Sequence, residues 1–150
     1  MLKESLIEIF ERDINKLKIE ISSYEDESKL WIIENEIKNC GGNLCLHLIG
    51  NLKQFIGNVL GKFEYTRNRD AEFNSKDIPK KDLVKEIEET KNIVIESLRN
   101  IEESEFDKKY PVNVFNNDMT TGFFLVSLVG HLNYHLGQIN YHRRIIGSKK

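Results

Sequence analysis

One segment, residues 122–146, combines a long helical pattern with three of the chain's four histidines: GFFLVSLVGHLNYHLGQINYHRRII. His131 and His135 stand four positions apart, which is about 40° around a helix, so their side chains meet one turn apart on the same face. His142 lies two turns, about 10 Å, beyond His135 and is too distant to share an ion with it. The segment therefore predicts a helix that presents two neighbouring imidazoles.

The pair formed by His131 and His135 has two interpretations on spacing alone. Two neighbouring imidazoles can ligate one divalent metal ion. The same pair can instead lie in an apolar core, where ordinary hydrogen bonds satisfy buried histidines. The spacing is that of the HExxH zinc-protease motif, but the intervening residues are Leu132, Asn133 and Tyr134. The missing glutamate is the general base of such enzymes, so the sequence argues against metalloprotease chemistry.

Three further helices are predicted upstream of this segment. Apolar residues recur at three- and four-residue steps from Leu2 to Tyr24, from about Asn43 to Lys62, and from about Pro79 to Ile101. We expect Asn43 to cap the second helix, Pro79 to lie near the start of the third, Thr120 or Thr121 to cap the last, and Gly147 to end it. No alternating strand pattern competes with these helices. The sequence predicts an all-α fold, a four-helix bundle.

Long loops separate the predicted helices. The segment EYTRNRDAEFNSKDIPK, residues 64–80, is polar and aperiodic, and a second connection with one proline covers residues 102–118. Simple up-down-up-down order therefore does not follow from the helix count. At 150 residues the chain has the common length of one domain, and we expect a single domain over residues 1–150.

Glycines recur seven residues apart in two of the predicted helices. Gly50 and Gly57 share one face of the second helix, and Gly130 and Gly137 share one face of the last. Each glycine costs about 0.5–1 kcal/mol relative to alanine inside a helix, so a compensating contact is expected. The spacing predicts a close backbone approach between these two helices.

Composition narrows the expected partners and location. The formal net charge is −2, which gives no electrostatic footprint for nucleic acid or an anionic membrane. The charged N-terminal stretch contains no apolar signal-peptide core, and no run of 18 apolar residues occurs, so we expect a cytoplasmic protein. Cys40 and Cys45 have no second pair to complete a structural zinc site and are expected to be reduced thiols.

A third metal ligand has to come from outside the last helix, and spacing alone does not identify it. His47 is the only other histidine. Polar side chains fall within about 40° of it around the second helix; they are Asn43, Asn51, Gln54 and Asn58. Gln138 extends a similar ridge one turn beyond His135. Such residues can hold ligand imidazoles, but a solvated or dimer-facing helix side gives the same pattern. For His142 we expect a surface role, with a substrate-side or interface position as the alternatives.

Three stretches of this chain resemble the DinB/YfiT-like superfamily of predicted metalloenzymes, and more closely its branch first catalogued as a domain of unknown function. The stretches are NLCLHLIGNLKQFIG (residues 43–57), RNRDAEF (67–73) and HLNYHLGQINYHRRIIG (131–147). The resemblance implies a bundle, usually a homodimer, with a metal held by His47, His131 and His135. Some superfamily members transfer low-molecular-weight thiols such as bacillithiol or mycothiol. For RNRDAEF no catalytic role is implied, and a salt-bridge network that closes the long loop is the simplest interpretation.

Three histidine ligands leave an open coordination position, which is typical of catalytic sites. Zinc or nickel is the expected ion, with iron, copper or manganese as alternatives. The leading hypothesis is a metal-dependent enzyme that acts on a small-molecule substrate, either by thiol transfer or by hydrolysis. The rivals are a non-catalytic metal-binding protein of stress response or dimerisation, and a plain helical module. The candidates for a general base are Tyr134, Tyr141 and His142.

Overall fold

The computed structural model describes residues 1–148 and is built from helices throughout that range, with one isolated β-bridge between Lys109 and Thr120. The long helices are α1 (Leu2–Ser22), α2 (Gly41–Leu52), α4 (Lys80–Asn100) and α5 (Thr121–Ile146). A π-helical segment, Lys53–Asn58, continues α2, and α3 (Arg69–Asn74) is a short helix. Two 3₁₀ segments, Glu27–Trp31 and Glu103–Asp107, complete the structure. The predicted all-α class is confirmed.

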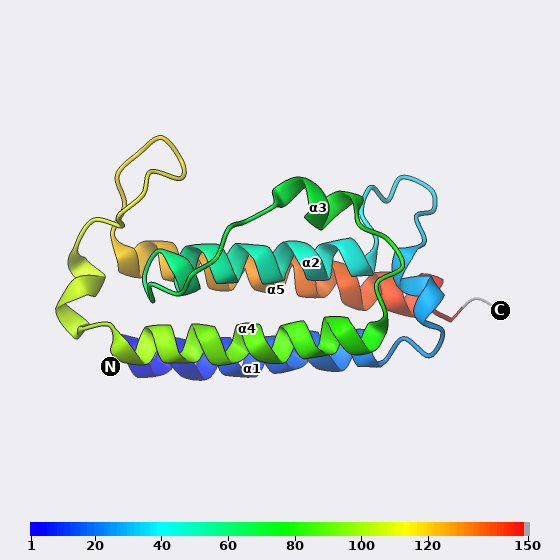
Figure 1. Ribbon diagram of the computed structural model, residues 1–150, viewed down its shortest axis with the longest axis horizontal. Helices are drawn as coiled ribbons and strands as arrows, with labels where there is room; N and C mark the ends of the chain where they lie inside the picture. Colours follow the sequence, from blue (N-terminus) through cyan, green and yellow to red (C-terminus); the bar gives the residue numbers. More distant parts are fainter. Residues whose placement is uncertain (149–150) are drawn as a thin grey trace.

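The long helices lie side by side as two antiparallel pairs, α1 with α4 and α2 with α5 (Figure 1). The colours show that α2 and α4 run in the same direction, although they follow one another in the chain. The connection between them returns along the outside of α2 and carries α3 there (Figure 1). The long loop thus resets the chain direction, which is why the order is not up-down-up-down.

The apolar pattern of the first helix forms one wall of the core. Five of its apolar residues at three- and four-residue steps are fully or almost fully buried: Leu6, Phe10, Ile14, Leu17 and Ile21. On α5 the buried residues follow the same periodicity and include Phe124, Leu128, Leu132 and Ile139. Burying such a side chain contributes about 1.5–3 kcal/mol each. Packing of these apolar faces in the core therefore determines the rotation of α5 about its axis, and with it the direction in which His131 and His135 project.

The predicted helix starts are confirmed except for one. Thr120 caps α5 by accepting a hydrogen bond from the Phe123 N–H at 3.1 Å, and Pro79 directly precedes α4. Asn43 is not the cap of α2, because the helix already begins at Gly41. A side chain at Gly41 would overlap the Tyr24 hydroxyl, so glycine lets the helix start against that ring. The double glycine opens the helix and does not precede it.

The predicted glycine contact between the second and last helices is wrong. A Cβ at Gly130 or Gly137 would meet nothing within 4 Å. On α2, a Cβ at Gly50 would overlap the Glu72 carboxylate of α3, and one at Gly57 would press on Ile93 of α4. A seven-residue spacing places glycines on one face, but it does not say which neighbour covers that face.

No helix in residues 1–148 combines the length and the apolarity needed to cross a membrane.

Cys40 and Cys45 are both buried and are free thiols. Burial raises the pKa of the Cys45 thiol well above its ordinary value, so this side chain is an unreactive core residue.

Candidate metal centre

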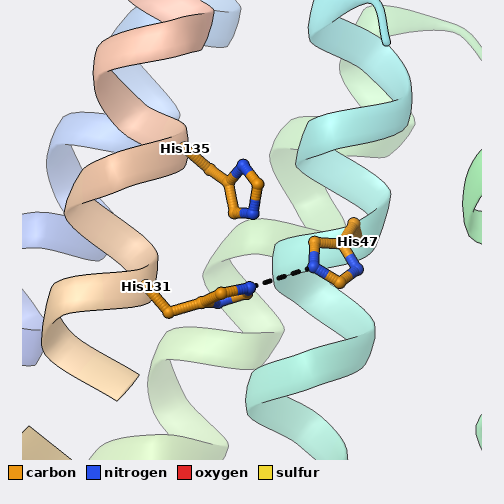
Figure 2. A group of neighbouring side chains, drawn as sticks. All are labelled: His47, His131 and His135. Carbon is orange, nitrogen blue, oxygen red and sulfur yellow. Dashed lines mark hydrogen bonds between the residues drawn. The ribbon is translucent and has the colours of Figure 1, made fainter. Parts of the chain in front are cut away.

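Three histidines converge in the space between α2 and α5. His47 projects from the second turn of α2, and His131 and His135 project one turn apart from α5; Figure 2 shows the three rings pointing toward one another. One ring nitrogen from each lies within 4.8 Å of the others. The Nε2 atoms of His47 and His131 are 3.1 Å apart. The structure thus brings together the three histidines singled out in the sequence.

The spacing of these nitrogens suits a single ion. Two imidazole nitrogens bound at 2.0–2.1 Å to one tetrahedral zinc ion lie about 3.3 Å apart. The observed 3.1 Å between His47 Nε2 and His131 Nε2 is close to that separation. A donor set of three imidazoles also fits zinc, nickel, iron or copper better than magnesium or calcium, which prefer oxygen ligands. The residues present therefore fit a divalent transition-metal ion.

Glu72 orients the ring of His47. Its Oε1 atom lies 3.1 Å from His47 Nδ1, and both side chains are buried. When Nδ1 donates its hydrogen to this carboxylate, the lone pair of the imidazole is on Nε2, which faces His131. A carboxylate on the far nitrogen is the usual partner of a metal-binding histidine, where it fixes the tautomer and makes the ligand more basic.

Arg67 in turn holds Glu72. Its Nε donates to Glu72 Oε2 at 2.8 Å and its Nη2 to Oε1 at 2.9 Å, so the guanidinium grips both carboxylate oxygens. The loop-closing salt bridge expected for RNRDAEF is therefore present. It also reaches the histidine centre, which the spacing did not indicate. Arg69 and Asp70 of the same segment are exposed and form no ion pair within residues 1–148.

Two residues of α2, Asn43 and Gly50, determine where α3 and Glu72 lie. Asn43 Nδ2 donates to the backbone oxygens of Glu72 and Ser75, at 2.9 and 2.8 Å. Gly50 leaves the space that the Glu72 carboxylate occupies. Glu72 is the residue that the sequence reasoning missed as a partner of the centre. The only signal was its place in RNRDAEF, because a helix of six residues is too short to show a periodic pattern.

Gln138 and Asn51 differ in their relation to the histidines. Gln138 Oε1 lies 2.7 Å from His135 Nδ1, so His135, like His47, has an acceptor on its far nitrogen. Asn51 is buried one turn after His47, but its Oδ1 atom has no hydrogen-bond partner in the described part of the chain. Elsewhere on the polar ridge, Asn58 donates to the Phe63 oxygen at 2.8 Å and stabilises the end of the helix.

Burial keeps the imidazoles of His47 and His131 neutral. The pKa of His131 is lowered to about 4, first by burial and then by the nearby charges of His135, His47, Arg67 and Arg69. Burial also lowers the pKa of His47, although Glu72 acts in the opposite direction. A neutral imidazole retains the lone pair that a metal requires. The electrostatics of the centre thus favour metal binding over protonation near pH 7.

The surface role predicted for His142 is wrong. This ring is buried, with Nδ1 2.6 Å from the Tyr24 hydroxyl and Nε2 2.9 Å from the Ile32 backbone oxygen. It joins α5 to the segment that follows α1. Of the other candidates for a general base, Tyr134 and Tyr141 are exposed on α5. The sequence could not show which turn of α5 the connecting loop would cover.

A cavity of about 260 Å³ opens directly against the centre, and we call it the Arg69 cavity. Its wall contains two of the histidines, polar side chains and an apolar group: His47, His131, Asn51, Arg67, Arg69, Ser127, Phe55, Val114, Phe115, Phe124 and Leu128. A larger cavity of about 430 Å³ reaches Gln138 but none of the three histidines. The Arg69 cavity is therefore an approach through which a small molecule can meet the rings of His47 and His131.

Comparison with known proteins gives a family without an assigned activity. A family model described as "Protein of unknown function (DUF1572)" matches residues 3–150, almost the whole chain. None of the curated proteins matches this sequence significantly.

Proposed function

This chain belongs to the DUF1572 family of proteins of unknown function, and we propose that it is a metal-dependent transferase that uses a thiol as nucleophile. The observation that carries the proposal is the set of three histidine nitrogens within 4.8 Å of one another, two of them with an acceptor on the far nitrogen. A histidine cluster that served only the core would have no need of such oriented lone pairs.

The proposal includes the finer fold assignment. Four long helices in two antiparallel pairs, with one histidine on α2 and an HxxxH pair on α5, agree with what the resemblance to the DinB/YfiT-like superfamily implies. We assign the chain to a four-helix bundle of that type. The metal ligands are His47, His131 and His135, and Gln138 steadies His135 as Glu72 steadies His47.

When bound, the ion supplies Lewis acidity that lowers the pKa of a thiol or a water molecule at its open position. The protein's own side chains favour the thiol. Within the described residues, the wall of the Arg69 cavity contains no Asp, Glu, Lys or Tyr to act as a general base. Glu72 is already paired with Arg67 and His47. A thiol is partly ionised near pH 7 without help, whereas water is not.

Zinc or nickel is the proposed ion, and metal content tests the centre itself. Protein purified without a histidine tag and reconstituted with zinc is expected to retain about one ion per chain after dialysis. His135→Ala should lose most of it, because two imidazoles bind far more weakly than three. Tyr141→Ala, an exposed change on the same helix, should retain it. Wild-type protein that holds neither zinc nor nickel would overturn the proposal.

Thiol transfer is tested separately on the metal-loaded protein. Glutathione and bacillithiol are incubated with a model electrophile such as 1-chloro-2,4-dinitrobenzene, and conjugate formation is followed by absorbance. The expected result is that the wild type catalyses conjugate formation and that His135→Ala does not. A higher thiol concentration should not restore the activity of this variant. Loaded protein that is inactive with every thiol would support the second candidate below.

The second candidate is a non-catalytic metal-binding protein of stress response or dimerisation, and the exposed face of α5 favours it. Large apolar side chains lie on this face although they are solvent-exposed in the single chain: Phe123, Val126, Tyr134, Tyr141 and Ile145. Gly130 and Gly137 lie among them with open space above. Such a face suits a homodimer in which two copies of α5 approach closely.

A further inference from the structure

Arg69 gives the cavity beside the candidate metal centre an uncompensated positive charge. The neighbouring Arg67 is neutralised by Glu72 through two hydrogen bonds. Arg69 also lines the cavity, but it forms no ion pair within residues 1–148. No carboxylate is among the described residues of the cavity wall. An anion that enters therefore meets a free guanidinium and no opposing charge.

Another part of the same cavity wall is apolar and largely aromatic. The rings of Phe55 and Phe124 pack edge-to-face with centroids 5.2 Å apart, and Phe115 lies 6.0 Å from Phe124. Phe115 is 58 % exposed, so a ligand that covers this ring removes apolar surface from water. The cavity thus joins one cationic group to an apolar surface, which selects molecules with both an anionic and an apolar part.

Asn51 lies in the cavity wall and has a buried hydrogen-bond acceptor without a partner in the described residues. The side chain lines the wall and is only 6 % exposed, yet its Oδ1 atom has no partner in the described structure. A buried acceptor without a partner costs about 1–3 kcal/mol. Oδ1 itself has almost no accessible surface, so a ligand O–H or N–H group would reach it only after the Asn51 side chain rotates toward the cavity.

We propose that the Arg69 cavity binds a small organic acid, with its carboxylate at Arg69 and its apolar part against Phe115. The volume of about 260 Å³ lies below the roughly 300–1,000 Å³ of sites for drug-sized molecules, which limits the acid to a small one. That the reacting group of the acid lies at His47 and His131 rests on the proposed metal-dependent function. Recognition of the acid's carboxylate by Arg69 does not depend on that function.

The test compares a carboxylate with its neutral isostere. Phenylacetate and phenylacetamide are titrated into the full-length protein by calorimetry, in metal-free and zinc-loaded form, with zinc content measured on the same samples. We expect the wild type to bind phenylacetate at least tenfold more tightly than phenylacetamide. Arg69→Gln should abolish this preference. Arg99→Gln, which removes another exposed arginine far along α4, should leave it intact.

The outcomes separate this inference from the proposed function. Equal affinity for acid and amide, or no binding of the acid at 10 mM, overturns the inference even if zinc is bound. A preference for the acid that survives in Arg69→Gln also overturns it, because a group other than Arg69 would then hold the carboxylate. If the protein binds no zinc but still prefers phenylacetate to phenylacetamide through Arg69, the inference is supported and the proposed metal-dependent function is overturned.

Discussion

The carboxylate of Glu72 contacts two parts of the candidate metal centre at once. One oxygen accepts from His47, and both oxygens accept from Arg67. The ion pair is almost completely buried on the glutamate side. Removing one partner of a buried pair leaves the other charge unpaired, so this carboxylate affects both the tautomer of His47 and the position of α3.

Glu72→Gln is expected to weaken zinc binding about 10–100-fold, since partners on the far nitrogen of a ligand histidine typically have effects of this size. The amide keeps the shape of the side chain but loses the charge that fixes the Nδ1–H tautomer. Zinc affinity is measured by competition with a fluorescent chelator. Asp70→Asn is the matched control, because it removes an exposed carboxylate of the same segment that forms no ion pair within residues 1–148. Unchanged affinity in Glu72→Gln would limit Glu72 to loop closure.

Gly50→Ala is expected to destabilise the protein by about 1–3 kcal/mol, because the new methyl group overlaps the Glu72 carboxylate. The same change in a Glu72→Ala background should instead stabilise α2 by about 0.5–1 kcal/mol, which is the ordinary helix preference of alanine over glycine. Urea unfolding of the four proteins gives the coupling energy. A loss of stability that persists in the Glu72→Ala background would disprove this contact as the cause.

His142 makes stability depend on pH. Burial lowers the pKa of His142, while the Ile32 backbone oxygen and Glu34 act in the opposite direction. The Tyr24 hydroxyl lies at hydrogen-bond distance from its Nδ1 atom. Because the unfolded chain takes up a proton more readily, with an ordinary histidine pKa of about 6.5, this contribution is complete above that pH and is lost as pH falls toward the folded pKa. Urea midpoints of metal-free protein between pH 7.5 and pH 5 should fall more in the wild type than in His142→Gln. Equal slopes would show that His142 is not the responsible group.

At the scale of elements, the residues of α5 fall on three faces of the helix. One face packs into the core, a second carries His131 and His135, and a third exposes Phe123, Val126, Tyr134 and Tyr141 to solvent. The third face falls within about 100° around the axis. Gly130 and Gly137 on this face lower the stability of the helix, and in the single chain no neighbouring atom uses the space above them. Close packing of a second copy of α5 against this face would explain why glycine occupies both positions.

Tyr134→Glu is expected to convert a homodimer of about 35 kDa, twice the chain mass of 17.6 kDa, into a monomer. A buried glutamate at the centre of an apolar interface would have to be desolvated without a partner. Sedimentation velocity measures the mass. Ile19→Glu is the control, because it introduces the same charge at an exposed apolar position of α1. A wild type that sediments as a monomer at 100 μM, or a Tyr134→Glu variant that stays dimeric, would exclude this interface.

Much of the helical framework can be predicted from sequence because its signals are local. The apolar stripe of α1, the caps at Thr120 and Pro79, and the meeting of His131 with His135 all follow from helix periodicity and short-range hydrogen bonds. The start of α2 and the helix α3 escaped prediction. The first depends on Tyr24 packing against Gly41, and the second is held by contacts from Asn43 and Gly50 to residues far along the chain.

For the whole molecule, the residue sequence by itself determined the helical class and two of the three histidine neighbours, since those depend on spacing of at most a few residues. The tertiary structure alone decided that His47 faces them, that Glu72 crosses from α3 to orient it, and that His142 is buried. These contacts join residues 25 to 118 positions apart, as the pairs His47–Glu72 and Tyr24–His142 show. No local rule specifies such pairs, because they form only when the return of the chain outside α2 and the packing of the apolar stripes have fixed how the helices lie together.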